Sequence, residues 1–279
     1  MILIADSGST KTNWSQVDEL SGSEIRQCQT SGINPFYQDK KTILRLLKKE
    51  FIIPFQDLIS LYFYGAGCSG NESKAIVQVP LKAYFDPVTL SVESDLMAAA
   101  RSLCQHSEGI TCILGTGSNS CYYDGKEIAL QIPSLGYILG DEGSGADIGR
   151  RLVSDILKKQ LPHAITEQFF STYSFSPEQI LEHVYKNPFP NRFLARFATF
   201  VSENITEPAL QNLVRSGFNK FFTRNIRQYP QAQDHPVHFT GSVAYYFKDI
   251  LEESAALNGF QIGIITRNPM EGLIRFHQM

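Results

Sequence analysis

The sequence has few cysteines, and their spacing forms neither a disulfide frame nor a metal site. There are five, an odd number, and no two of them form a C-x-x-C pair: Cys28, Cys68, Cys104, Cys112 and Cys121. Of the six histidines only His235 and His238 sit close together, where they alternate with Val237 on a predicted strand. We therefore expect reduced thiols, as in a cytoplasmic protein, and histidines with structural roles.

Long apolar runs and an excess of charge of either sign are also lacking. No apolar run approaches the roughly 18 residues of a membrane span. The opening run, Met1 to Ala5, lacks a basic flank and stops at Asp6, so no signal peptide is predicted. A net charge of −3 gives no general attraction to nucleic acid or anionic membrane. We expect a cytoplasmic protein that works without either.

What the sequence does contain is an internal repeat. The segment "ILIADSGST" at the start has a counterpart in "TCILGTGSN" at residues 111–119, and in both an apolar strand runs into a loop of small hydroxyl and glycine residues. Later in each half a strand ends in glycine before a helix, in "SLYFYGAG" and in "PVHFTGSV". The second separation is longer, which indicates an insertion at about residues 142–230, where apolar spacing predicts helices.

The repeat predicts an α/β protein with the order β-β-β-α-β-α-β-α in each of two duplicated domains that face a central cleft. The expected domains are residues 1–108 and 109–268, the second carrying the helical insert. The segment 269–279 is expected to form a short helix that packs back on the first domain.

The loop after the first strand has two interpretations. Ser, Gly and Thr residues suit an ordinary hairpin turn, but they also offer amide and hydroxyl donors to phosphate oxygens. Asp6 beside the loop could hold a hydrated Mg²⁺, which prefers oxygen ligands. A Walker A loop cannot be written through these residues. The second loop of the same kind, Gly115 to Asn119, favours phosphate binding, because two such loops could act as two jaws on one polyphosphate.

Three further segments carry chemistry-bearing residues. "GAGCSG" at residues 65–70 matches a dinucleotide-binding pattern, but because the repeat pairs its first glycine with Gly241-Ser242, we reject that interpretation. Asp95 lies where a strand gives way to a helix, which by itself favours a helix N-cap over a general base. "GDEGSG" places Asp141-Glu142 just before a helix, where acidic residues also cap, yet its glycines suggest backbone close to a ligand.

Together, "DSGSTKT", "GTGSNS", "GDEGSG" and "TGSV" in this order resemble the sugar kinase, Hsp70 and actin superfamily. Within it the match is to the N-acetylglucosamine kinase and benzoyl-CoA reductase activator-type ATPase family. The resemblance spans nearly the whole chain and implies two actin-like (ribonuclease H-like) domains.

The resemblance also implies roles for individual residues. Asp95 matches the catalytic base, which reverses the N-cap interpretation, and Asp6 lies near the metal. The residues that would contact ATP are Ser7, Gly8, Ser9, Thr10, Lys11, Thr116, Gly117, Gly241 and Ser242. The residues that would contact or border the sugar are Asn34, Ser118, Asn119, Gly136 and Asp141. The implied cofactors are ATP and Mg²⁺.

The leading functional hypothesis is ATP-dependent phosphorylation of N-acetylglucosamine at its 6-hydroxyl. Kinases for glucosamine or N-acetylmuramic acid are alternatives of the same class. A different class is an ATPase activator of a dehydratase or reductase, which would hold an iron-sulfur cluster through cysteines, and a third is a non-catalytic sugar or nucleotide sensor. The oligomeric state is left open, with a homodimer as one option.

Overall fold

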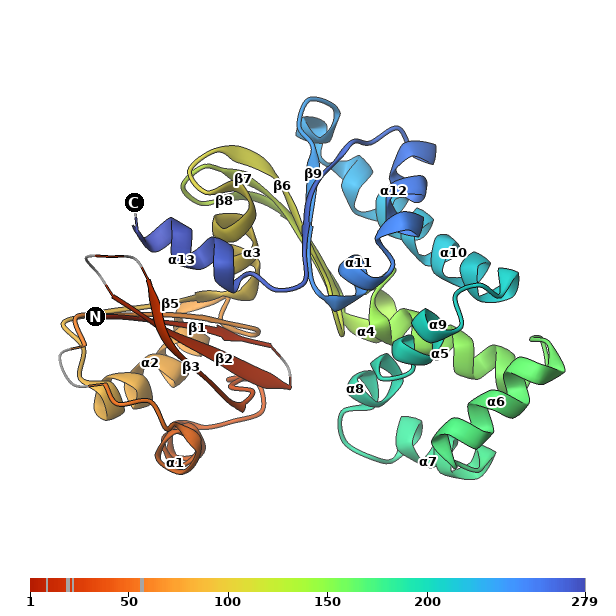
Figure 1. Ribbon diagram of the computed structural model, residues 1–279, viewed down its shortest axis with the longest axis horizontal. Coiled ribbons are helices and arrows are strands. Elements are labelled where there is room, and N and C mark those ends of the chain that lie inside the picture. The colour runs from red at the N-terminus through yellow and green to blue at the C-terminus, as the bar shows by residue number, and fades with distance from the viewer. Residues whose placement is uncertain (9, 19–20, 22, 56–57, 279) are drawn as a thin grey trace. The chain divides into compact units, whose positions relative to one another are not determined.

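The computed structural model describes residues 1–8, 10–18, 21, 23–55 and 58–278. Contacts divide the chain into two compact units (Figure 1). The first comprises Met1–Glu108, Tyr123–Ala129 and Asn268–Met279, and the second comprises Gly109–Tyr122 and Leu130–Arg267. Within the described part of the chain, no helix is both long and apolar enough to cross a membrane.

The first unit is built on a five-stranded mixed sheet in the order β3-β2-β1-β4-β5. Its strands are β1 (Ile2–Ser7), β2 (Lys11–Val17), β3 (Glu24–Ser31), β4 (Ser60–Gly65) and β5 (Thr89–Ser94). Its helices are α1 (Lys40–Glu50), α2 (Asn71–Phe85), α3 (Asp95–Cys104) and α13 (Met270–Gln278). The first three strands form an antiparallel meander, whereas β1, β4 and β5 are parallel, so these three strands end at one edge of the sheet.

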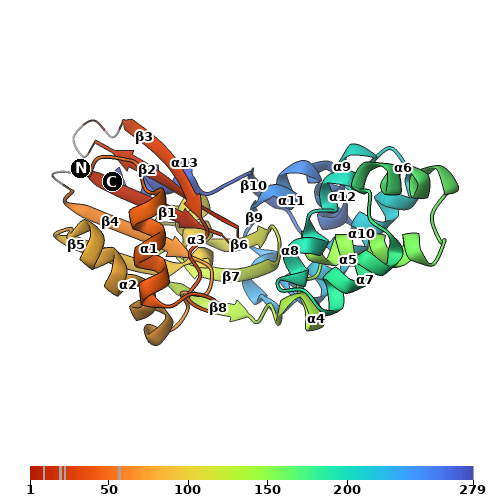
Figure 2. The same cartoon turned by 90° about the horizontal axis from the view of Figure 1, so that it is seen from below.

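Alternation along β1 gives this sheet two buried faces. Leu3 and Ala5 join a core with Trp14 and Phe51 under α1 and α2, whereas Ile2 and Ile4 join a core with α3 and α13. Figure 1 shows the helices on these two faces, and Figure 2 is seen from the side of α1 and α2. The helix of residues 270–278 is therefore part of the first unit's core.

The second unit repeats the plan with a sheet in the order β10-β9-β6-β7-β8. Its strands are β6 (Glu108–Leu114), β7 (Ser118–Asp124), β8 (Ile128–Ile132), β9 (Val237–Thr240) and β10 (Ile262–Thr266). The tip of the β7–β8 hairpin groups with the first unit. The helices after β9 are α11 (Ser242–Tyr246) and α12 (Lys248–Leu257). The predicted α/β fold with two duplicated actin-like domains is confirmed by this shared strand order.

Helices fill the sequence between β8 and β9. They are α4 (Gly136–Leu139), α5 (Gly145–Leu157), α6 (His163–Tyr173), α7 (Pro177–Tyr185), α8 (Pro190–Ala195), α9 (Ala198–Glu203), α10 (Pro208–Arg224), η1 (Ile226–Gln228) and η2 (Pro230–Gln233). Only His238 of the histidine pair lies on β9, because the strand begins at Val237. Its ring accepts a hydrogen bond from the Ile264 amide at 3.0 Å, a structural role.

Candidate functional site

The turn between β1 and β2 contains the first predicted phosphate loop. The Gly8 amide donates to the Lys11 carbonyl at 3.0 Å, so this segment is a hairpin turn. Gly8, Thr10 and Lys11 are exposed, which leaves them accessible to a ligand. Predicted ATP contact Ser9 lies outside the described residues. Hairpin turn and phosphate loop are thus compatible descriptions of the same segment.

Ser7 connects this turn to the segment that carries Asn34. Its fully buried hydroxyl lies 2.7 Å from the Thr12 hydroxyl, donates to the Ile33 carbonyl and accepts from the Ile33 amide. The predicted phosphate contact of Ser7 stays a prediction, since its hydroxyl already has these partners. Its hydroxyl thus links the β1–β2 turn to the segment that carries Asn34.

Two carboxylates gather where the parallel strands end. Asp6 is level with Tyr64 of β4, which is level with Glu93 of β5, and Asp95 follows at the start of α3. Burial, followed by the charge of Asp95, raises the pKa of Asp6 to about 7, while a hydrogen bond from Asn13 and the charge of Lys11 oppose this shift. Burial also raises the pKa of Asp95. Ionisation of these two carboxyl groups is therefore less favourable than in water, and a bound cation would stabilise their charged forms.

The donor set at Asp6 suits Mg²⁺ that arrives with a nucleotide. The described residues contain no group of three or more acidic, histidine or cysteine side chains able to hold a metal ion alone. Mg²⁺ commonly keeps several waters and binds through one or two carboxylates together with substrate phosphates. A single charge-strained carboxylate beside an exposed hairpin turn fits that mode of binding.

Asp95 is not the N-cap of α3, contrary to what the residue pattern alone suggested. The cap is Ser94, whose hydroxyl accepts from the Met97 amide at 3.1 Å. Asp95 is the first helical residue, and its Oδ1 accepts from the Leu96 amide at 2.9 Å. Because Ser94 already caps the helix, the carboxylate of Asp95 is available for another role.

Asn34 occupies a tight turn after β3 and is buried. Its side-chain oxygen accepts from the Phe36 backbone amide at 2.9 Å, and the backbone amide of Asn34 donates to Gln38 Oε1 at 2.8 Å. A Cβ on Gly67, whose φ is +83°, would lie 2.7 Å from that side-chain oxygen. With the oxygen occupied, Asn34 could approach a ligand as a donor through Nδ2.

The second predicted phosphate loop, Gly115 to Gly117, is attached to the N-terminus of α5. The Gly145 amide donates to the Gly115 carbonyl at 2.8 Å, and the Ala146 amide donates to the Thr116 carbonyl at 3.0 Å. Ser144 caps α5 by accepting from the Asp147 amide, so capping by Asp141-Glu142 was a wrong interpretation. The helix N-terminus thus fixes the loop through two backbone hydrogen bonds.

Asp141 lies against this loop in a conformation that few residues adopt, with φ +53°. Its Oδ1 accepts from the Ser118 amide at 3.1 Å, and a Cβ on Gly117 would approach within 3.0 Å of its carboxylate. Burial, opposed by the Ser118 hydrogen bond and assisted by the charges of Glu142 and Asp147, raises the pKa of Asp141 to about 6. A buried, strained carboxylate of this kind is typical of a functional position.

The other predicted sugar neighbours of the second unit differ in their burial and in the hydrogen bonds they already make. Ser118 is buried, whereas Asn119 already accepts from Ser120 and Gln131 through its Oδ1. Gly136 begins α4 with φ +74°, and a Cβ there would meet nothing within 4 Å. The positive φ favours glycine at this position, and its predicted sugar contact stays a prediction.

Gly241 and Ser242 form the entrance from β9 into α11, beside a cavity of about 440 Å³. Gly241 has φ +118°, and a Cβ there would collide with the Leu114 carbonyl. The cavity lies wholly within the second unit and is lined by Gly115, Thr116, Gly145, Ala195, Ala198, Thr199, Ser202, Glu203, Ser242, Val243, Tyr246, Phe247 and Arg267. Because it extends from the predicted phosphate loop to Tyr246, it could take a nucleoside.

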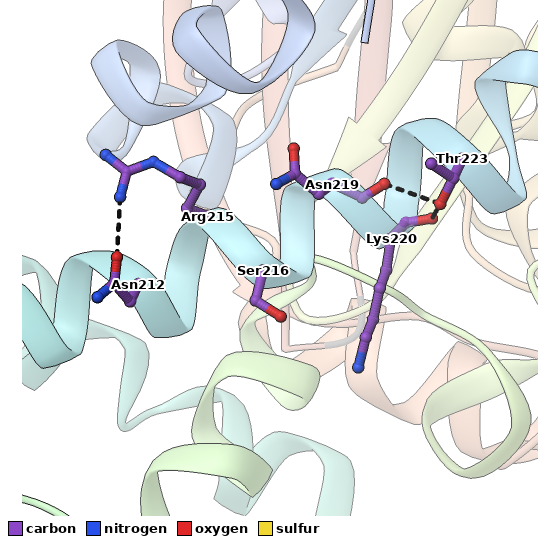
Figure 3. Close-up of a pocket in the computed structure, with 6 residues that line it drawn as sticks. All are labelled: Asn212, Arg215, Ser216, Asn219, Lys220 and Thr223. Carbon is purple, nitrogen blue, oxygen red and sulfur yellow. Dashed lines mark hydrogen bonds between the residues drawn. The ribbon is translucent and has the colours of Figure 1, made fainter. Parts of the chain in front are cut away.

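A second hollow, of about 380 Å³, follows the polar face of α10 (Figure 3). It is lined by Asn212, Arg215, Ser216, Asn219, Lys220 and Thr223. None of the six belongs to the buried face of that helix. Arg215 donates to Asn212 Oδ1 at 3.0 Å and pairs with Glu253 at 2.9 Å, so its guanidinium already has partners in this hollow.

Sequence reasoning missed several residues that the structure brings to these sites. Asn13 carries no motif, yet it supports Asp6. Thr199, Ser202 and Arg267 line the nucleoside-sized cavity, and Arg267 lies 5.4 Å from the ring centre of Tyr246. The repeat, which paired Gly241 with Gly65, and the family resemblance, which implied ATP contacts at Thr116 and Ser242, pointed toward this region but not to these three residues.

Two solved structures are similar to this chain over nearly its full length. A structure from Porphyromonas gingivalis, described as a candidate N-acetylglucosamine kinase, is 43% identical with a TM-score of 0.96, and the match covers 100% of this chain and 99% of that one. A glucokinase of the ROK family from Streptomyces griseus, solved with glucose and AMPPNP, is 13% identical with a TM-score of 0.58 over 99% of this chain and 97% of its own, which shows a shared fold.

A curated N-acetylmuramic acid/N-acetylglucosamine kinase of Clostridium acetobutylicum is 35% identical over 94 residues. That match spans 33% of this chain and 30% of the relative. No protein-family model matches the chain.

Proposed function

We propose that this protein, a member of the N-acetylglucosamine kinase family, transfers the γ-phosphoryl group of ATP to the 6-hydroxyl of N-acetylglucosamine. The observation that carries the proposal is the pair of partly buried carboxylates, Asp6 and Asp95, where parallel strands end, with Asp6 beside the exposed β1–β2 turn. Full-length similarity to the Porphyromonas gingivalis protein supports the sugar kinase class.

Asp95 is the proposed general base. A sugar hydroxyl has a very high pKa, so its proton must leave as its oxygen attacks the γ-phosphorus. The raised pKa of Asp95 makes it a better proton acceptor than an exposed aspartate. Ser94 caps the helix in its place and leaves the Asp95 carboxylate available for this step.

The remaining residues bind and orient. Asp6 would hold Mg²⁺, which neutralises the charge that develops on the phosphate oxygens. The described part of the β1–β2 turn and the Gly115 to Gly117 loop would donate amides to the triphosphate, and the cavity beside Ser242 would take the adenosine. Asn34 would donate to a sugar oxygen, and Asp141, whose Oδ1 is bound to Ser118, would accept from a sugar hydroxyl through Oδ2.

Glucosamine and N-acetylmuramic acid are alternative acceptors, the latter supported by the partial match to the Clostridium acetobutylicum enzyme. An ATPase activator is less well supported, because Cys68, Cys104, Cys112 and Cys121 are buried and separate along the chain. A sensor without catalysis would have no need of the charge-strained Asp6 and Asp95 pair.

The experiment that tests the proposal is ADP release from ATP with a panel of amino and N-acetyl sugars and a control without sugar. Turnover confined to N-acetylglucosamine establishes the proposed acceptor, and phosphorus NMR of the product locates the phosphate. Turnover with glucosamine or N-acetylmuramic acid alone would replace the acceptor. Equal turnover without sugar would contradict the kinase and favour the activator.

Sugar affinity is expected to weaken as the pH falls below about 6, where Asp141 gains a proton. The folded pKa lies above the ordinary value near 4, so the carboxylate that accepts a sugar hydroxyl is complete only above pH 6. The measurement is the pH profile of KM for the sugar at saturating MgATP. Asp141→Asn should raise that KM at pH 8 and flatten the profile, and an unchanged profile in this variant would contradict the assignment.

A further inference from the structure

We infer that a largely buried ion pair, Asp147 with Arg151, positions the loop that presents Asp141 to the sugar, and that both are positioning residues for substrate binding. The inference rests on the proposed function, because it assigns Asp141 to the acceptor site. The pair lies on α5, outside every motif that the sequence analysis singled out.

Asp147 binds the centre of the turn that follows Asp141. The Ser144 amide donates to the Asp141 carbonyl at 3.1 Å, which closes a turn with Gly143 inside it at φ +71°. The buried Gly143 amide donates to Asp147 Oδ2 at 3.1 Å. Without that acceptor a buried amide would be unpaired, so the turn depends on the carboxylate of Asp147.

Arg151 holds Asp147 in place. Its Nη2 lies 2.7 Å from Asp147 Oδ2 and its Nε lies 3.2 Å from Oδ1, a bidentate arrangement that fixes the orientation of the carboxylate. The side chains are 9% and 15% exposed, whereas Arg150, which also contacts Asp147, is 53% exposed. Solvent therefore weakens the Arg150 contact far more than the Arg151 contact.

The ion pair packs against α10, the long helix of the insert. Arg151 Nη1 donates to the Leu213 carbonyl at 2.5 Å. At Gly217 a Cβ would collide with the Arg151 guanidinium and would lie 3.3 Å from Gly143 Cα. The helix thus approaches the turn at a point where both segments have glycine, and α10 of the insert supports the turn that carries Asp141.

The phosphate loop has separate support. Its carbonyls accept from the Gly145 and Ala146 amides, and neither bond involves Asp147 or Arg151. Loss of the ion pair should therefore affect the sugar more than the nucleotide. A residue needed only for folding would affect both.

The test is Arg151→Gln, with Arg215→Gln as the matched control. Arg215 lies on the polar face of α10 (Figure 3), and it pairs with the exposed Glu253 at 2.9 Å. We expect Arg151→Gln to raise KM for the acceptor sugar about tenfold, with a smaller change in kcat and nucleotide affinity within about twofold of wild type. Arg215→Gln should behave as wild type in all three.

Arg151→Gln leaves a buried carboxylate without its partner and could fail to fold. Asp147→Ala with Arg151→Met removes both charges, and the same rise in sugar KM is expected. An unchanged sugar KM in this double variant, or an equal loss of nucleotide affinity measured by calorimetry, overturns the inference. Absence of turnover by the wild-type protein with every sugar would instead remove the proposed function, and this inference with it.

Discussion

Replacing Asp95 by Asn is expected to lower kcat for phosphorylation of the acceptor sugar by about 10³-fold, within the range that general bases contribute. The amide has nearly the same shape and can still accept from the Leu96 amide, so the start of α3 should remain intact. It cannot take the proton of the sugar hydroxyl. Nucleotide affinity should be nearly unchanged, because no phosphate or base contact is assigned to this side chain.

Steady-state measurement of kcat together with calorimetric titration of an ATP analogue checks this result. Glu93→Gln is the matched control, since it makes the same chemical change two residues earlier at a side chain that pairs with Lys74 at 2.6 Å. Normal kcat in Asp95→Asn would remove Asp95 from the mechanism. An equal loss in Glu93→Gln would assign the effect to local charge rather than to proton transfer.

Much of the fold could be predicted because the repeat is written in local sequence. Apolar strands that end in glycine and hydroxyl residues recur in both halves, and the sheets have the same strand order. The residues that cap the helices were less predictable. Ser94 and Ser144 cap helices where Asp95, and the pair Asp141-Glu142, also looked suitable, and a cap is decided by backbone geometry that a sequence does not state.

Site residues that belong to a sequence motif could be predicted, whereas those brought to the site only by packing could not. Asp6 was found from its loop, but its closeness to Asp95 follows from the order of β1, β4 and β5. Asp147 and Arg151, four residues apart, look like a surface helical pair. Their burial comes from α10, more than fifty residues later in the chain. Long-range packing of this kind leaves no local signal.

Replacing Asp6 by Ala is expected to lower kcat/KM for MgATP about 100-fold with every acceptor, and to raise the Mg²⁺ concentration needed for half-maximal rate. The reason is that Asp6 is the one carboxylate assigned to the metal, so its loss cannot depend on which sugar is bound. A titration of rate against free Mg²⁺ at saturating ATP measures the effect. Unaltered metal dependence would contradict the assignment.

The Asp6 carboxylate also leads to a prediction about thermal stability, which can be tested without an activity assay. In the protein without ligands, the pKa of Asp6 is raised to about 7 from an ordinary value of 3.8, so folding is opposed by its ionisation. That penalty is absent below pH 4, grows as the pH rises, and is complete above pH 7. Asp6→Asn should therefore have a higher Tm than wild type at pH 8, and the difference should shrink toward pH 4. Mg²⁺ with an ATP analogue should stabilise wild type more than Asp6→Asn, because only the wild-type carboxylate gains a cation. A variant that is less stable than wild type at pH 8 would show that Asp6 is held for structure and not for a metal.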